Sequence, residues 1–143
     1  MKTRSSVHPV STLRLRAPHV LAAMFASSGT VHLVRPQAFA AIMPRAIPGR
    51  HHRKLIYLSG LFELVCAVGL FRRAARAAPA SVAVLGAVFP ANLQMALDAG
   101  SGRNPGAADK RLVAWGRLPL QIPMVWAALQ SRPDVQRTPS AAP

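Results

Sequence analysis

The amino-acid sequence predicts an all-α protein, a bundle of four transmembrane helices. Apolar residues make up 51% of its 143 residues, although the formal net charge is +14. These two properties coexist because lysines and arginines crowd the segments between four long apolar runs. A helix that spans a bilayer needs about 20 mostly apolar residues, with about 17 as the lower limit, and each run approaches or meets this length.

The same composition argues against a nucleic-acid partner. A basic nucleic-acid-binding protein carries its arginines and lysines on amphipathic helices or strands with aromatic residues among them, at lower hydrophobicity. Here aromatic residues make up 6% of the chain and lie mostly in the apolar runs, and the mean hydropathy is +0.24. The expected surroundings are the lipid bilayer, with anionic lipid headgroups at the basic loops.

The expected organisation is one membrane domain at residues 17–131 between two flexible tails. Residues 1–16 are polar and basic, and residues 132–143 are rich in proline, serine and alanine, which is typical of disordered ends. The predicted spans are residues 18–34, 55–71, 77–99 and 112–130.

The first span has two features that need interpretation. The basic segment before it and the small residues within it are also found in secretory signal peptides. Three further apolar runs follow, and the first span continues through His32, so a retained helix is favoured over a cleaved signal. His32 follows Ser28 and Gly29 by about one turn, and small residues at that spacing allow another helix to approach closely. The imidazole can therefore reach a neighbour's polar group, or it can lie at the interface and bond to lipid or water.

The loop at residues 35–54 has three prolines and two adjacent histidines. Residues 37–42 predict one short helical turn in the interface, with Phe39, Ile42 and Met43 facing lipid.

Metal binding and thiol chemistry are not expected. His51 and His52 have no nearby Asp, Glu or Cys to complete a metal shell, so a solvated or headgroup-facing loop is expected there. Cys66 is the only cysteine, whereas electron transfer from thiols to quinones needs a cysteine pair. We therefore expect Cys66 to be a small buried hydrophobe. Without a nucleophile and base or a nucleotide-binding loop, no catalytic residue is assigned and a stand-alone enzyme is not expected.

The second span holds a glutamate at bilayer depth, Glu63. A charged side chain there costs several kcal/mol unless it is protonated or paired, so it marks a site. Gly60, Glu63 and Ala67 share one helix face, and small residues on that face suit helix contact. The expected partner is Arg117, the basic residue well inside the fourth run. The pair can be a structural lock, or it can serve proton or ligand binding.

The third and fourth spans are expected to be kinked. Pro90, Pro119 and Pro123 each remove one helix hydrogen bond. Polar side chains near such kinks can shape a pocket for a quinone or a lipid headgroup, or they can satisfy one another. The candidate intramembrane polar cluster consists of His32, Glu63, Asn92, Arg117 and Gln121.

The basic residues divide almost equally between the two sides of the predicted bundle, so the positive-inside rule gives little preference for either orientation. The tight group Arg72, Arg73 and Arg76 favours a cytoplasmic second loop, and this places both termini in the cytoplasm.

Four motifs together resemble the DoxX-like family of small bacterial membrane proteins, and the likeness extends over about residues 23–130. The motifs are GTVHLVRPQAFAAIMP at residues 29–44, YLSGLFEL at 57–64, FPANLQMAL at 89–97 and RLPLQIP at 117–123.

This resemblance implies a multi-pass protein of the bacterial inner membrane. The wider family is linked to redox partners, and one branch is named for a subunit of a thiosulfate:quinone oxidoreductase. It therefore implies an accessory or quinone-interacting subunit of a membrane redox system, with a quinone between the helices and a redox partner protein. The alternative is a non-catalytic membrane scaffold or a small-molecule permeation protein. The residues of this sequence that match the motif positions of the DoxX-like family are His32, Pro36, Pro44, Gly60, Glu63, Pro90, Asn92, Arg117, Pro119 and Gln121.

Overall fold

The computed structural model describes residues 9–40, 43, 47–100 and 111–131. This part of the chain is all-helical, which confirms the expected fold class. Its five helices are α1 (Pro9–Val34), α2 (Gln37–Ala40), α3 (Gly49–Phe71), α4 (Ala77–Gly100) and α5 (Arg111–Leu129).

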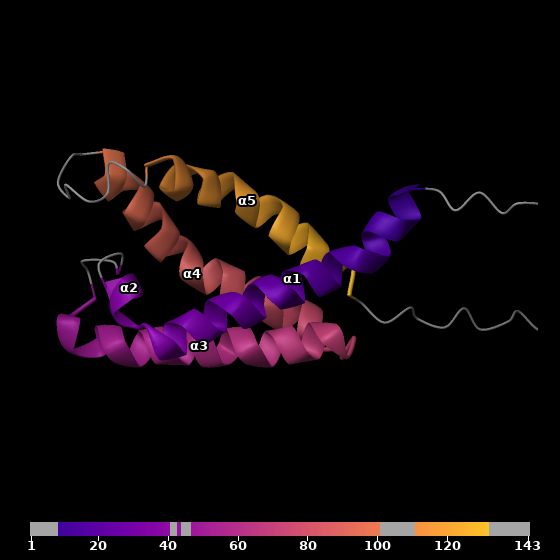
Figure 1. The fold of residues 1–143 in the computed structure, drawn as a ribbon, viewed down its shortest axis with the longest axis horizontal. Coiled ribbons are helices and arrows are strands. Elements are labelled where there is room, and N and C mark those ends of the chain that lie inside the picture. The colour runs from indigo at the N-terminus through magenta and orange to yellow at the C-terminus, as the bar shows by residue number, and fades with distance from the viewer. Residues whose placement is uncertain (1–8, 41–42, 44–46, 101–110, 132–143) are drawn as a thin grey trace, which may run out of the picture.

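Helix α1 begins earlier than the sequence predicts. It starts at Pro9 and not at Pro18, so residues 9–16 are helical although a flexible tail is expected there. Proline suits a first helical position, where its missing N–H has no helix partner to lose. Pro18 lies inside α1, and the helix bends in its N-terminal part (Figure 1), as expected where a proline removes a backbone hydrogen bond.

Helix α3 also begins earlier, at Gly49, so the basic residues 50–54 form its first turns and not part of a loop. The short α2 lies within the helical turn expected at residues 37–42, of which residues 41 and 42 are outside the described part. Helices α4 and α5 begin and end within one residue of the predicted spans.

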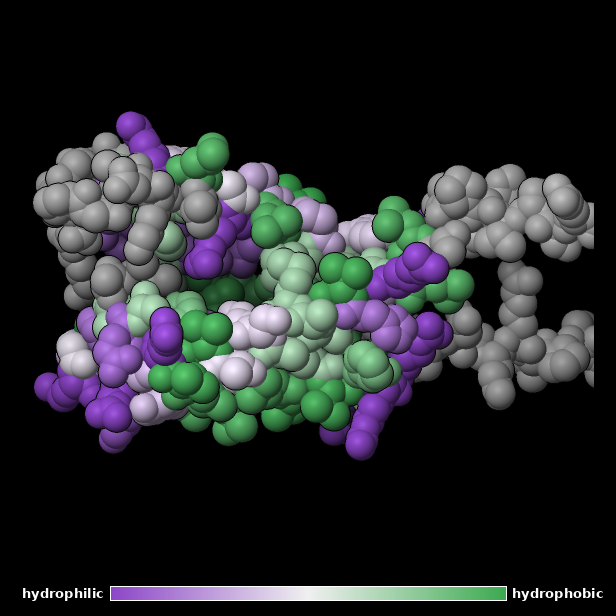
Figure 2. Space-filling model, viewed as in Figure 1, coloured by the Kyte–Doolittle hydropathy of each residue, from purple (hydrophilic) through white to green (hydrophobic). Residues whose placement is uncertain are grey.

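Within the described part of the chain, two helical segments are long and apolar enough to cross a membrane, Gly49–Phe71 and Ala77–Ala99. Many large apolar side chains on the described helices are exposed, among them Phe62, Val65 and Ile122. Figure 2 shows hydrophobic residues gathered along the middle of the molecule and hydrophilic residues mainly toward its two ends. This distribution suits a protein whose middle is surrounded by lipid.

The helices pack as two pairs. Helix α1 lies along α3, and α4 lies along α5 (Figure 1). The pairs are close together where α3 ends and α4 begins, and they spread apart toward α2 (Figure 1). The main core contains Leu21, Phe25, Leu70 and Ala128, and Cys66 is buried among these residues as a free thiol, as expected of a small hydrophobe.

Candidate functional site

The site begins at the crossing of α1 and α3, where two glycines meet. A Cβ atom placed on Gly29 would lie 2.7 Å from the Gly60 carbonyl oxygen, and one placed on Gly60 would lie 2.7 Å from His32 Cβ. Any side chain larger than hydrogen would therefore hold the two backbones apart. This close approach places His32 of α1 beside Glu63 of α3.

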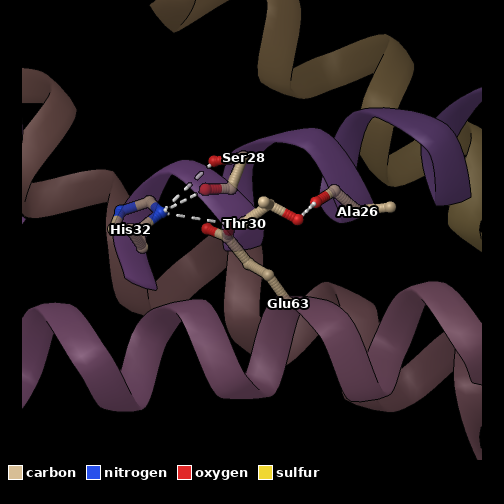
Figure 3. A network of polar contacts seen from close by, with 5 residues as sticks. All are labelled: Ala26, Ser28, Thr30, His32 and Glu63. Carbon is tan, nitrogen blue, oxygen red and sulfur yellow. Dashed lines mark hydrogen bonds and ion pairs between the residues drawn. The ribbon is translucent and has the colours of Figure 1, made fainter. Parts of the chain in front are cut away.

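His32 and Glu63 form a buried pair (Figure 3). The Nδ1 atom of His32 lies 3.4 Å from Oε2 of Glu63, and the two side chains are 11% and 6% exposed. A carbonyl oxygen can only accept, so Nδ1–H donates to the Ser28 carbonyl at 2.9 Å. Although Oε2 of Glu63 lies near this nitrogen, it makes no hydrogen bond within the described structure.

The other contact of His32 comes from α2. The Phe39 ring stacks on the imidazole with their centroids 3.7 Å apart and an angle of 17° between the rings. Phe39 and Met43 line the same cavity as His32, so the expectation that they face lipid was wrong. Stacking on the imidazole turns the Phe39 ring toward the protein, and α2 covers part of the site.

Arg117 does not pair with Glu63. Arg117 is an exposed residue, and within the described structure the basic side chain that lies next to the Glu63 carboxyl group is the imidazole of His32. The reason lies in helix packing: α5 carries Arg117 and packs mainly on α4, whereas Glu63 lies on α3 at its crossing with α1. The position of Glu63 along its predicted span does not reveal which helix faces it.

Gln121 links α5 to α4. Its Nε2 atom donates to the carbonyl oxygen of Leu85 at 2.9 Å, and Gln121 is buried. Leu85 immediately precedes Gly86, whose carbonyl loses its helix donor at Pro90. Gln121 therefore bonds to the neighbouring helix one residue before the carbonyl that Pro90 leaves without a donor. Asn92 lies half-buried beyond the proline on α4.

These residues surround one cavity of about 570 Å³ between the two helix pairs. Its wall is mostly apolar, with side chains from all five helices. Pro90 lies on this wall, whereas Pro119 and Pro123 are not among the residues that line it. All five residues of the candidate polar cluster line it: His32, Glu63, Asn92, Arg117 and Gln121.

Sequence reasoning missed Ser59. Its side chain lies on the cavity wall one turn before Glu63, and its Oγ atom is buried without a hydrogen-bond partner in the described part of the chain. The signal was present in the spacing, because residues four apart share a helix face. A serine is also common in membrane helices, where it bonds to its own backbone, so it did not stand out.

The cavity offers hydrogen-bonding groups more than metal ligands. Over residues 9–40, 43, 47–100 and 111–131, no group of three or more His, Cys, Asp or Glu side chains is placed to hold a metal ion. The arrangement can bind a small molecule that has an apolar body and a polar head.

A family model described as "Domain of unknown function (DUF8561)" matches residues 21–132. Every residue on the cavity wall lies within this matched segment. No curated protein and no solved structure matches the chain.

Proposed function

Since this chain belongs to the DUF8561 family, whose function is unknown, we propose a function from its cavity. The protein is a four-span membrane protein that binds a quinone between its helices, as an accessory subunit of a membrane redox system. The observation that carries the proposal is the placement of all five residues of the candidate polar cluster on the wall of one mostly apolar cavity. The resemblance to the DoxX-like family supports the redox setting.

The size and lining of the cavity suit such a ligand. Small-molecule sites measure about 300–1,000 Å³ and are mostly apolar, with a few polar groups that orient the ligand. The cavity of about 570 Å³ lies within that range. Quinone carbonyl oxygens need donors, and the guanidinium of Arg117 and the amide of Asn92 are donors on the wall.

The helix lengths support four spans. Helices α1 and α5 have 26 and 19 residues. At 1.5 Å per residue they are about 39 Å and about 28 Å long, close to or above the ~30 Å hydrocarbon core. They pack along α3 and α4, which among the described helices are the two apolar enough to cross a membrane by length and composition. Lipid around all four would cover the exposed apolar side chains.

The proposed location is the bacterial inner membrane, with both termini in the cytoplasm. The α3–α4 connection carries three exposed arginines, and α1 begins at the same end of the molecule with exposed Arg14 and Arg16 (Figure 1). Arginines near span ends favour the cytoplasmic side.

Cysteine labelling tests this orientation. Cys66 is first replaced by serine, and single cysteines are introduced as Arg50→Cys or Arg76→Cys. Both positions are exposed; Arg50 lies in the first turn of α3, and Arg76 lies in the α3–α4 connection beyond its other end. In intact spheroplasts, a membrane-impermeant maleimide should label the Arg50→Cys variant and spare Arg76→Cys until the cells are lysed. The opposite pattern would place the termini outside.

Native mass spectrometry of the detergent-extracted protein tests the function. Wild type should retain a quinone, and Arg117→Gln should retain less because a shorter, neutral amide replaces the charged guanidinium donor on the cavity wall. Arg111→Gln is the matched control, since Arg111 is also an exposed arginine of α5 but does not line the cavity. Bare protein in every sample, with no co-purifying oxidoreductase, would overturn the proposal.

That outcome would favour a non-catalytic scaffold or a permeation protein. The observation behind this second candidate is the tight crossing at Gly29 and Gly60, which with the His32–Glu63 pair can hold the bundle without any ligand. A scaffold should bind neither a quinone nor other apolar small molecules in the cavity.

A further inference from the structure

Arg117 is an accessible charged residue on the cavity wall. Four residues of α5 line the cavity at helical spacing: Arg117, Leu120, Gln121 and Met124. Residues three or four apart share a helix face, and Gln121 on this face bonds to the Leu85 carbonyl of α4. The side chain of Arg117, an exposed residue, therefore leaves α5 on the side that borders the cavity.

Within the described part of the chain, no carboxylate pairs with Arg117. Glu63, an acidic residue on the same wall, lies beside His32 and is 4% exposed, so it offers little surface to a ligand. A guanidinium is always charged and has five N–H donors. The charge of Arg117 therefore borders a mostly apolar cavity, and the described residues supply no counter-charge for it.

Such an arginine is costly in a membrane span. Arg117 is the seventh residue of α5, about 9 Å from the start of the helix at 1.5 Å per residue. Charged side chains within spans pair with an opposite charge, or extend to the lipid head groups where the span end is near. A ligand anion in the cavity would supply the missing counter-charge.

We propose that the cavity binds an amphipathic anion, whose carboxylate or phosphate head pairs with Arg117 while its alkyl chain lies along the apolar wall. The inference rests on the membrane setting of the proposed function, but not on the quinone. A guanidinium can form two parallel, charge-assisted hydrogen bonds with either head group, which are stronger than those to a neutral oxygen.

The rest of the wall suits an alkyl chain. Val84, Val88 and Met124 of the α4–α5 pair line the cavity, and Leu58 and Phe62 of α3 line it as well. Small-molecule sites are mostly apolar, with a few polar groups that fix the orientation of the ligand. In this cavity Arg117 would hold the head group and the apolar wall would hold the chain.

The test is a titration of the purified full-length protein in detergent, read out by native mass spectrometry. The probes have chains of equal length and different head groups: palmitate, hexadecyl phosphate, hexadecanol and hexadecyltrimethylammonium. At least one of the two anions should bind about tenfold or more tightly than hexadecanol, because hydrogen bonds between charged groups are the stronger ones. The cation should bind more weakly than the alcohol. Comparison of the two anions identifies the head group.

Substitutions at residue 117 assign the preference to its charge. Arg117→Gln should weaken binding of the anion about tenfold or more and leave hexadecanol unchanged. Arg117→Lys, which keeps the charge but loses the paired hydrogen bonds, should retain part of the preference. Arg111→Gln is the matched control, because Arg111 is also an exposed arginine of α5 but does not line the cavity.

A second pair of variants places the chain in the cavity. Ala87→Phe adds a bulky side chain to the cavity wall on α4 and should weaken binding of the anions and the alcohol alike. Ala83→Phe is its control, because residue 83 lies one turn earlier on α4, is equally classed as exposed and does not line the cavity. Both substitutions are at exposed positions, so the fold should persist.

The outcomes separate this inference from the proposed function. Equal binding of the anions and hexadecanol would overturn the inference. A preference that Arg117→Gln removes and Ala87→Phe leaves unchanged would overturn it too, because the arginine would then bind head groups outside the cavity. Quinone retention is measured before any probe is added, so its absence overturns the quinone function whether or not the anions bind. Anion preference lost in Arg117→Gln, with binding weakened in Ala87→Phe and not in Ala83→Phe, is the result that we expect.

Discussion

The crossing of α1 and α3 gives the sharpest prediction about this fold: Gly60→Ala should destabilise the protein. A Cβ atom on residue 60 would lie 2.7 Å from His32 Cβ and 2.9 Å from the Gly29 carbonyl oxygen, well inside the 3.4 Å at which ordinary contact begins. Neither neighbour is the end of a flexible side chain. The backbones of both helices must therefore move apart.

The size of the effect follows from two opposing terms. Overpacking typically costs about 1–3 kcal/mol, and two contacts that involve backbone or Cβ atoms belong in the upper half of that range. Replacing glycine by alanine inside a helix recovers up to about 1 kcal/mol. The net destabilisation of Gly60→Ala should be about 1–3 kcal/mol. Gly86→Ala, where no atom lies within 4 Å of the added carbon, should be neutral or up to about 1 kcal/mol stabilising.

Thermal unfolding in mild detergent, followed by circular dichroism, compares these two variants with wild type. Gly116→Ala serves as a second control, because the added carbon again meets nothing within 4 Å. The melting temperature should fall for Gly60→Ala and stay level or rise for the controls. If Gly60→Ala melts at or above the wild-type temperature, the close crossing of α1 and α3 is refuted, and with it the placement of His32 beside Glu63.

Two further predictions concern single contacts of the site. Gln121→Leu should cost about 1 kcal/mol of stability through its lost bond to the α4 carbonyl, whereas Gln130→Leu, which loses an exposed 3.3 Å bond, should cost little; equal melting of the two variants would contradict this. In a double-mutant cycle read out by melting, His32→Phe and Glu63→Gln should couple by about 0.5 kcal/mol or more, since the two side chains touch. Arg117→Gln and Glu63→Gln should add independently, and strong coupling there would restore the pair that the sequence alone suggested.

Much of the candidate site was predictable because its residue types are unusual for their surroundings. A glutamate in an apolar run and amides beside helix prolines are costly in lipid unless they have partners, so Glu63, Asn92 and Gln121 could be selected without a structure. The structure brings these residues to one cavity wall. Ser59 could not be selected in this way, because a serine in an apolar run is ordinary.

The partner of Glu63 could not be predicted, and the reason is physical. Depth along a span can be estimated from position in the sequence, but which helix lies opposite a given face depends on packing between segments far apart in the chain. Charge complementarity suggested Arg117. The glycine contact between α1 and α3 instead places His32 next to Glu63, and α5 packs mainly on α4.

The sequence by itself determined the helical fold class, the approximate ends of α4 and α5 and the identity of the polar residues. Apolar run length and residue chemistry are local properties, and they need no knowledge of neighbours. Only the tertiary structure decided that the helices pair as α1 with α3 and α4 with α5, that a cavity remains between the pairs, and that Phe39 turns inward onto His32. These features depend on the fit of side chains from distant segments, such as the glycine carbonyls at the α1–α3 crossing, and hydropathy does not encode that fit.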